Sequence, residues 1–413
     1  MKKRKSSTFR GAAVVAHLQA LHAGRDPVRL AMKYRAMRRS FGDFVRGTCS
    51  LFYLRAGDVE MPPSPSIWIC GDVHLGNFGI YEAEDARLRF DLNDFDEAGI
   101  APCLLDLLRL LAALRAASAD PDDGRAMAKH AVAAYAAGLM KGADAAFDEA
   151  AGESILPKLF ALAHKRDRGR WLDERTERAA GGRHFKLDGE KTLPSTPDER
   201  AALFSLAERL GQEFDAPSFF NPIDAARRIS GVGSLGLPRF LLGVAGEGKP
   251  NDVRLLDVKA ARKPAFVVRL HLPCPPGVDD AERTIQAQWL ILERPSAPIA
   301  AVDLLGDRFT VREVQPCAVR LEASLKYPRK LGRVLGKALA RAHMRAARRT
   351  SATDAFDNFT HDATHWSGDV AATGILFADT LHDDWRSYVS AYDKGAFAVW
   401  DQPNCDSAHY APP

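Results

Sequence analysis

Hydrophobic and polar positions follow helical spacing over residues 26–56, and again from Pro102 to about Ser118. Between these regions the Pro-rich segment MPPSPS precedes two short apolar runs, SIWIC and LRFDL, which predict strands. The polar segment GDVHLGNFG lies between the two runs. The pattern therefore predicts a polar loop flanked by two strands inside a helical region.

The second half of the chain predicts a strand-rich region that is followed by helices. After a helix at about 198–213, five runs have strand character: RRISGVGSLG, PRFLLGVAG, VRLLDVKAAR, APIAAVDLLG and DRFTVREVQP. Between the third and fourth runs lies DDAERTIQAQWLILE, and LGRVLGKALARAHMRAARR and DDWRSYVSAYDKGAFAVW come near the end, all with helical periodicity. The charged region 165–200 fits a lid, a substrate loop or an exposed insertion.

These elements predict an α+β protein in three parts. Residues 1–220 form a helical part that carries the polar loop, 221–318 form a β-rich part, and 319–413 return to the helical part. A length of 413 residues is sufficient for two lobes around a cleft.

The composition narrows the class of protein. The net charge is only +4, and the one basic block is the start, MKKRK, so we expect no nucleic-acid partner. The six cysteines include no C-x-x-C pair, which argues against a zinc site or a disulfide framework. Asp106, Arg109 and Arg115 interrupt the longest Leu-rich run, so we expect no membrane span. We therefore expect a cytoplasmic protein.

The polar loop and the segment after the second strand hold the candidate chemistry. Asp72 and Asn77 lie in the loop, and Asp94 and Asp96 follow in FDLNDFDEAG. Phosphoryl transfer needs a carboxylate for the proton of the attacking hydroxyl, and hard oxygen ligands for Mg²⁺. Each residue alone is typical of a turn or a cap. Their combined spacing favours a magnesium-dependent site.

These segments resemble known motifs. GDVHLGN and FDLNDFDEAGIAPCLLDLLRL resemble the catalytic loop G-D-x-H-x-x-N and the metal-binding segment I-D-F-x-x-A of aminoglycoside-phosphotransferase-like members of the protein-kinase-like superfamily, including a downstream acid at Asp106. The chain also resembles a bacterial family called domain of unknown function 2252. That family's RG, GDxHxxNFG and DLNDFDEA segments match residues 46–47, 71–79 and 91–98, and this resemblance covers most of the chain.

The resemblance implies roles for individual residues. Asp72 resembles the catalytic acid, Asn77 the metal-binding amide and Asp94 the metal-binding acid, with Asp91 and Asp96 as rival ligands. His74 is expected to shape the loop. Cys70 stands where kinase-like loops usually have a histidine.

Candidates for nucleotide binding lie downstream of the loop. Gly231, Gly233 and Gly236 form G-x-G-x-x-G, and the Pro and apolar run that follow favour a hairpin over the helix of a Rossmann turn. The next strand ends with Lys259, as in the V-A-I-K strand of kinases, although a lysine there usually extends to solvent.

A helix after the lysine strand offers an acidic partner for Lys259. Glu282 is the first candidate and Glu293 the rival, although a solvated helix face explains Glu282 equally well. The segment from Glu313 to Cys317 is the expected hinge beside an adenine ring.

The order of these parts differs from that of ordinary kinases. The catalytic loop comes first, the glycine hairpin and lysine second, and LGKALARAH, which resembles the helix before the catalytic loop, last. We therefore expect a circularly permuted, protein-kinase-like fold of two lobes.

The expected function is an ATP- and Mg²⁺-dependent phosphotransferase that acts on a hydroxyl of a small molecule or a protein. Three alternatives stay open: a nucleotide-binding pseudokinase or regulatory module, a transferase of AMP to a protein hydroxyl, and a metal-dependent hydrolase that uses Asp72, His74 and Asp94 without ATP. His361 and His365 in HDATH lack a third ligand and lie in an expected loop, which argues against zinc.

Overall fold

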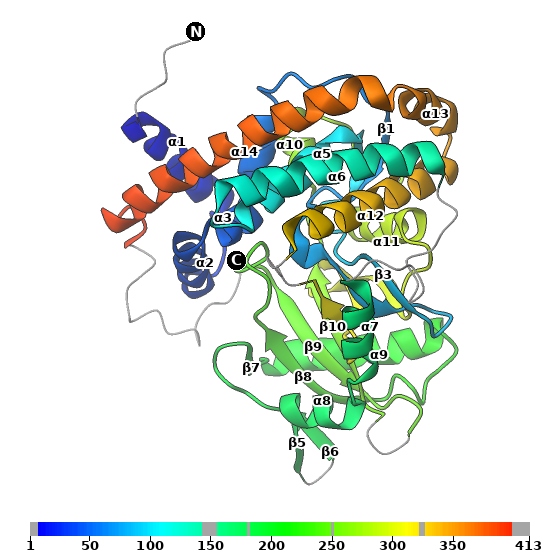
Figure 1. Ribbon diagram of the computed structural model, residues 1–413. Coiled ribbons are helices and arrows are strands. Elements are labelled where there is room, and N and C mark those ends of the chain that lie inside the picture. The colour runs from blue at the N-terminus through cyan, green and yellow to red at the C-terminus, as the bar shows by residue number, and fades with distance from the viewer. Residues whose placement is uncertain (1–6, 143–154, 180–181, 249–251, 322–326, 399–413) are drawn as a thin grey trace.

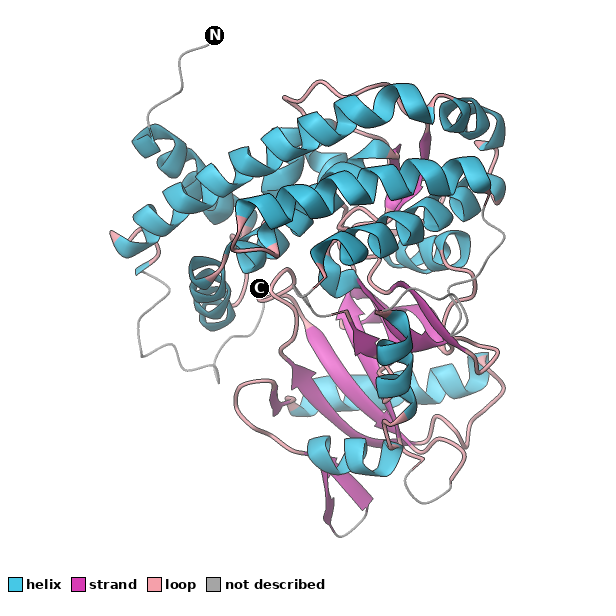
Figure 2. Cartoon of the chain, viewed as in Figure 1, coloured by secondary structure: helices cyan, strands magenta, loops and turns pink. Residues whose placement is uncertain are grey.

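The chain forms a helical part and a part built on a six-stranded sheet (Figure 1). The computed structural model describes residues 7–142, 155–179, 182–248, 252–321 and 327–398. In Figure 2 the strands of the large sheet lie together on one side of the molecule, and most helices lie on the other. All strand pairs are antiparallel, which confirms the α+β class.

The helical part holds the main hydrophobic core. Its helices are α1 (Ser7–Leu21), α2 (Pro27–Arg39), α3 (Phe41–Gly47), α4 (Cys49–Ala56), α5 (Leu104–Ala116), α6 (Pro121–Lys141), α12 (Pro328–Arg348), α13 (Thr353–His361) and α14 (Ala363–Asp393). In the middle of α12, only the basic side chains at 333, 337, 341 and 345 are partly exposed, on one stripe with a spacing of four. The rest of this stretch is buried, so α12 packs into the core beside α6.

Two small sheets flank the polar loop. One pairs β1 (Ser66–Ile69) with β4 (Gly99–Pro102), and the other contains β2 (Phe78–Glu82), β3 (Leu88–Leu92) and β13 (Val319–Arg320). SIWIC and LRFDL form strands, as expected, but they belong to different sheets. The loop connects β1 to β2 and ends in a single 3₁₀ turn, Leu75–Asn77.

The large sheet has the strand order β11-β12-β10-β9-β8-β7. The strands are β11 (Ile299–Leu304), β12 (Asp307–Glu313), β10 (Arg254–Ala260), β9 (Arg239–Val244), β8 (Pro222–Arg228) and β7 (Thr192–Pro194). β7 is a sixth strand that the sequence pattern does not predict. It has three residues, too few to show alternation.

Helix α9 (Pro197–Glu213) covers one face of the large sheet. Thr196 and Glu199 form a capping box at its start, and Leu203, Leu206 and Leu210 are buried against the strands. Because β7 and α9 both pack in this unit, the sheet part begins well before the expected boundary at residue 221.

The charged region 165–200 is folded rather than an open loop. It contains α8 (Arg168–Arg175), the hairpin of β5 (Thr176–Ala179) and β6 (Gly182–Phe185), and β7. Trp171 and Phe185 pack on Leu241 and Leu255 of the large sheet. These two aromatic side chains therefore secure the region to the sheet, despite its many charges.

Three further helices complete the fold. They are α7 (Leu156–His164), α10 (Ala265–Leu270) and α11 (Asp280–Ile291). α7 packs on β2, α10 packs on α4, and α11 contacts both β12 and α12. No helix among the residues that the structure describes is both long and apolar enough to cross a membrane.

Side-chain alternation along β10 decides which residues meet the helical part. Leu256, Val258 and Ala260 belong to the core with α9. Asp257 and Lys259 therefore point from the opposite face of the sheet. This face turns the lysine toward the polar loop.

Candidate active site

The polar loop is fixed from within the core by Asp106 of α5. Its carboxylate accepts hydrogen bonds from the backbone N–H groups of Cys70 and Gly71, both at 2.8 Å. His343 of α12 lies with Nε2 at 3.2 Å from the same carboxylate, and its Nδ1 is 2.7 Å from the hydroxyl of Tyr135. Two helices from distant parts of the chain thus set the position of the loop.

Gly71 allows the loop to pass close to the segment after β3, at Glu97. Its φ is +82°, and a Cβ atom there would lie 1.8 Å from the carbonyl oxygen of Glu97. A side chain at this position would meet both a strained backbone and a backbone clash.

Gly71→Ala should therefore lower the free energy of unfolding more than Gly142→Ala does. Gly142 has the same φ of +82°, but no atom of the described residues lies within 4 Å of the position that a Cβ would take there. Both variants carry the cost of a positive φ, about 1–3 kcal/mol. Gly71→Ala adds the clash, about 1–3 kcal/mol. Urea unfolding measures the difference, and equal losses would contradict the close approach.

Asp72 has one oxygen engaged and one left for the cavity. Oδ1 accepts from Nε and Nη2 of the fully buried Arg109, at 2.8 and 2.7 Å. Nη2 of Arg109 also donates to the carbonyl oxygen of Val45 at 2.6 Å. Oδ2 lies 3.8 Å from Nε2 of His74. Arg109 therefore fixes the carboxylate through Oδ1, and no described residue donates a hydrogen bond to Oδ2.

His74 is a neutral neighbour of this carboxylate at physiological pH. Burial lowers the pKa of His74 to about 4. Its Nδ1 is buried without a hydrogen-bond partner. The imidazole thus shapes the loop beside Asp72 without adding a charge, as expected from the sequence.

Asn77 closes the loop on Asp72. Its side-chain Nδ2 donates to the backbone carbonyl of Asp72 at 2.7 Å. This hydrogen bond directs the other end of the amide, the oxygen Oδ1, away from the loop backbone. An amide oxygen held in this way is a suitable ligand for a hard cation.

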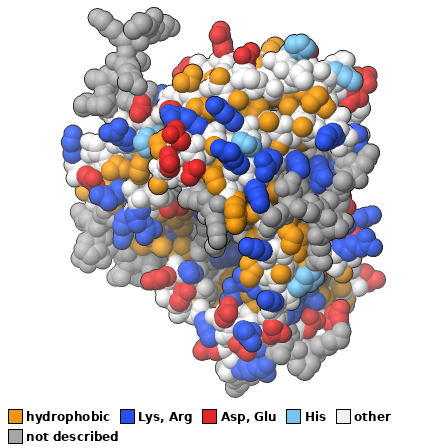
Figure 3. All heavy atoms as spheres, in the orientation of Figure 1, with side chains coloured by type: hydrophobic (Ala, Val, Ile, Leu, Met, Phe, Trp, Pro, Cys, Tyr) orange, Lys and Arg blue, Asp and Glu red, His pale blue; other side chains and the backbone are white. Residues whose placement is uncertain are grey.

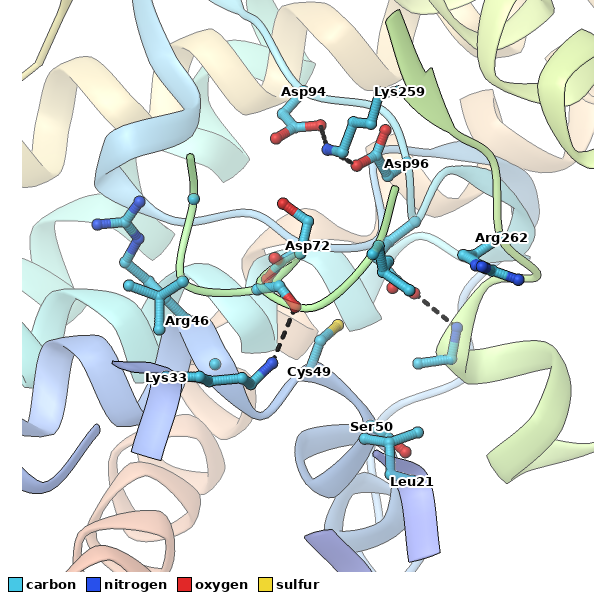
Figure 4. A pocket seen from close by; sticks show the side chains of 18 of the residues that line it. Leu21, Lys33, Arg46, Cys49, Ser50, Asp72, Asp94, Asp96, Lys259 and Arg262 are labelled. Carbon is cyan, nitrogen blue, oxygen red and sulfur yellow. Dashed lines mark hydrogen bonds and ion pairs between the residues drawn. The ribbon is translucent and has the colours of Figure 1, made fainter. Parts of the chain in front are cut away.

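Lys259 meets the segment that holds Asp94 and Asp96. Its Nζ bonds to Asp96 and lies 3.8 Å from Oδ1 of Asp94, although these acids precede it by more than 160 residues (Figure 4). Burial alone would raise the pKa of Asp94, but nearby cations, led by Lys259, outweigh burial and lower it to about 2. Burial also lowers the pKa of Lys259. The ammonium group of Lys259 and the carboxylates of Asp94 and Asp96 therefore form one cluster of interacting charges.

The glycine segment forms a turn across the same cavity. β8 ends at Arg228 and β9 begins at Arg239, so the segment connects two antiparallel strands. Gly231 and Gly233 line the cavity, whereas Gly236 lies outside its lining, against Arg25. In Figure 4 the turn passes in front of Asp72.

The cavity that these residues share has a volume of about 340 Å³. Asp72, Asn77, Asp94, Asp96, Gly231, Gly233 and Lys259 all line it. A second cavity, of about 710 Å³, shares Ser230, Arg239 and Arg320 with the first. Lys and Arg side chains gather over the middle of the face shown in Figure 3, where the helical part meets the sheet.

Glu282 does not meet Lys259, which corrects that expectation. It is the third residue of α11, and its carboxylate accepts from the backbone N–H of Asp279 at the helix start, 3.0 Å away. The rival Glu293 lies 3.4 Å from Arg89 instead. Asp96 takes the place of the expected glutamate as the partner of the lysine.

Asp91 does not belong to the site either. It is buried on β3 and pairs with Arg345 of α12 at 2.5 Å. It does not line the cavity, so Asp94 and Asp96 are the acids of this segment that face it.

The family of the chain follows from a comparison with family models. The model described as "Uncharacterized protein conserved in bacteria (DUF2252)" matches residues 25–391. The chain belongs to this family. The match confirms the predicted membership of this family, and the segments 46–47, 71–79 and 91–98 all lie inside the matched range. Comparisons with curated proteins and with solved structures found no match.

Two residues that position the site of this DUF2252 chain were not predicted from its sequence. Arg283 of α11 donates to the carbonyl oxygens of Asp96 and Arg262, both at 2.8 Å, and to that of Ala98. Buried Lys33 of α2 donates to the carbonyl oxygen of Gly233 at 2.8 Å. The sequence feature that could have identified them is their position in the helix. Each of these basic residues lies four residues before a buried apolar residue of the same helix, and therefore on the same face.

The histidine pair of the DUF2252 chain lies in helices rather than in the expected loop. His361 is the last residue of α13, and His365 belongs to α14, 3.2 Å from Asp362. In the described ranges, no three or more His, Cys, Asp and Glu side chains group as a metal site. A cation at the cavity would thus need ligands from a bound molecule as well as from Asn77 and Asp94.

Proposed function

We propose that this DUF2252 chain is an ATP- and Mg²⁺-dependent phosphotransferase that transfers the γ-phosphoryl group to a hydroxyl. The observation that carries the proposal is the meeting of three segments on one cavity: the loop of Asp72 and Asn77, the acids Asp94 and Asp96, and the strand lysine Lys259. Separate turn or cap residues have no reason to converge in this way. Phosphoryl transfer requires such a set.

The same proposal includes a protein-kinase-like fold of two lobes with circularly permuted order. Its support is the arrangement of parts: the loop and acids come first, then the glycine turn and lysine on an antiparallel sheet, and α12 last. The contact between His343 of α12 and Asp106 puts this late helix against the loop that it would precede in an unpermuted chain.

The residues fit Mg²⁺ that arrives with phosphates. Magnesium sites for nucleotides commonly use one or two carboxylates, with phosphate oxygens and water as the remaining ligands. Asp94 and the amide oxygen of Asn77 would hold the ion, with Asp96 nearby. When bound, Mg²⁺ neutralises the charge that develops on the phosphoryl oxygens.

The residues of this chain would share the chemical step as follows. Oδ2 of Asp72 accepts the proton of the acceptor hydroxyl as the hydroxyl oxygen forms a bond to the γ-phosphorus. The bond from that phosphorus to the β–γ bridging oxygen breaks, and ADP leaves with the electron pair. Lys259 and the glycine turn hold the phosphates, and Arg109 keeps Asp72 in position.

The second cavity suits the nucleoside. Glu313, Val314 and Gln315 of the expected hinge line it, as do the apolar side chains of Leu92 and Phe95. Its shared border with the first cavity at Arg239 would lead the phosphates toward Lys259. In this arrangement the flat base packs against apolar side chains and the phosphates bind cationic side chains. Ligand pockets commonly combine apolar walls with a few polar groups in this way.

Thermal unfolding tests nucleotide binding directly. ATP with Mg²⁺ should raise the Tm above that in ATP alone and in buffer, since a ligand at 100 times its Kd adds about 2.7 kcal/mol. Lys259→Met should reduce this shift, whereas Lys394→Met, at an exposed position outside the cavity, should keep it. No shift for the wild-type chain at millimolar ATP and Mg²⁺ would overturn the proposed function.

A further inference from the structure

One end of the first cavity is strongly basic. The end of α1, the start of α4 and the segment before and within α10 line this end. In Figure 4 Leu21 and Ser50 lie past Asp72 on the side away from Asp94, and Arg262 lies to one side of Asp72. The basic side chains of this region, which we name the cationic end, are Arg25, Lys33, Arg262, Lys263 and Arg269.

The charges of the cationic end are not neutralised by protein carboxylates. Within the described part of the chain, none of the five forms an ion pair, and their hydrogen bonds go to uncharged groups. Arg25 donates to the carbonyl oxygen of Leu235 at 3.4 Å, and Arg269 donates to the hydroxyl of Ser50 at 2.8 Å. Elsewhere in the cavity, the acids are already paired with Arg109 or Lys259.

Glu97 is the one acid among the described residues that line this end, and its carboxylate is already engaged by the backbone. It accepts from the N–H group of Ala265 at 2.6 Å. An anion brought into the cavity would therefore find cations that form no ion pair with a described carboxylate.

The cationic end lies where an acceptor belongs. The nucleoside cavity joins the first cavity at Ser230, Arg239 and Arg320, beside Asp94 and Lys259. A nucleotide that extends from there places its last phosphate toward Asp72. The space beyond Asp72 is then left for the molecule that carries the hydroxyl.

We propose that the acceptor of this enzyme is itself an anion, an alcohol with a phosphate or carboxylate group that the cationic end binds. This inference rests on the proposed function and names its substrate class. The anionic group pairs with Arg262 and Lys263 at the mouth and with Arg25 and Arg269 along the wall. The hydroxyl then lies at Oδ2 of Asp72, where its proton is taken.

Lys33 adds a second observation in favour of a bound anion. It is almost fully buried, and its Nζ donates to an uncharged group, the carbonyl oxygen of Gly233. Burial and the charge of Arg25 lower its pKa well below the usual range, and the charges of Asp72 and Glu97 act in the opposite direction without cancelling this effect. Without an anion, an ammonium in this place is costly. A phosphate or carboxylate close to it would offset that cost, so the site is arranged for a ligand of negative charge.

Binding to the nucleotide complex tests the inference. The full chain is saturated with a non-hydrolysable ATP analogue and Mg²⁺, and then titrated calorimetrically with three alcohols of one carbon skeleton: glycerol 3-phosphate, glycerate and glycerol. We expect at least one of the two anions to bind at least tenfold more tightly than glycerol. The phosphate and the carboxylate distinguish which anionic group the site prefers.

Two double variants show whether the cationic end is responsible. Arg262→Gln with Lys263→Gln should weaken binding of the preferred anion at least tenfold. Lys129→Gln with Lys394→Gln removes the same net charge at exposed positions outside the cavity and should leave binding unchanged.

Three outcomes would overturn the inference: no binding of either anion, equal binding of glycerol, or equal weakening in both double variants. In each of these cases, bound analogue would leave the proposed function intact. Failure of the analogue itself to bind would instead remove the proposed function, and the inference with it.

Discussion

Asp72→Asn should lower the rate of ADP formation from ATP by about 10²–10⁴-fold, the usual contribution of a general base. Asparagine keeps the shape of the side chain but cannot accept the proton of the acceptor hydroxyl. Nucleotide binding should persist, because Lys259, Asp94 and the glycine turn are unchanged. Steady-state ADP release measures the first effect, and the Tm shift with ATP and Mg²⁺ measures the second.

A loss of stability accompanies this change and needs its own control. Asp72 neutralises the buried guanidinium of Arg109, so Asp72→Asn should also cost about 3 kcal/mol of unfolding free energy. Asp384→Asn breaks another pair, in which a fully buried carboxylate bonds to Arg55 at 2.8 Å, and neither residue lines the cavity. That variant should lose comparable stability and keep its rate per folded molecule. Full activity in Asp72→Asn would reject the proposed role of the base.

Local patterns were sufficient to predict much of the site. Asp72 and Asn77 lie within six residues of one loop, and the resemblance of that loop to known motifs does not depend on the rest of the fold. Lys259 was predicted from its place at the end of an apolar strand that follows the glycine segment. Alternation along that strand then directs its side chain away from the core with α9. The glycine turn was recognisable because a strand, rather than a helix, follows it.

The acidic partner of Lys259 could not be found in this way. Glu282 and Arg283 are neighbours at the start of one helix, and helical spacing alone does not show which of the two side chains faces the cavity. In the structure, Glu282 forms the capping box at the start of α11, and Arg283 bonds to the backbone of Asp96. Which side of a helix start faces a distant loop is set by tertiary packing.

The same limit explains the errors in the fold. β7 is too short for periodicity, and it joins the sheet by pairing with β8 more than thirty residues later. The charged region 165–200 is polar on average, which predicts an exposed segment. The average conceals two large apolar side chains, Trp171 and Phe185, which pack on the sheet. Large apolar side chains at a few positions can secure a polar segment.

The second large effect is expected from Asp106→Ala, which should lower the free energy of unfolding by about 2–6 kcal/mol. The substitution leaves the backbone N–H groups of Cys70 and Gly71 buried without an acceptor, and each such donor costs about 1–3 kcal/mol. Chemical denaturation followed by circular dichroism measures the loss. Because these two residues directly precede Asp72, the rate per folded molecule should fall as well.

Asp224→Ala is the control for this prediction, because it removes a buried hydrogen-bond acceptor without affecting the polar loop. The Asp224 carboxylate also accepts two backbone N–H groups, from Phe185 at 2.7 Å and Ala225 at 2.9 Å, but it lies in the large sheet outside the cavity. Both variants should be destabilised, whereas only Asp106→Ala should lose ADP formation per folded molecule. If Asp106→Ala kept that rate, the loop would hold Asp72 in place without Asp106, and the proposed link from α5 and α12 to the carboxylate of Asp72 would be wrong.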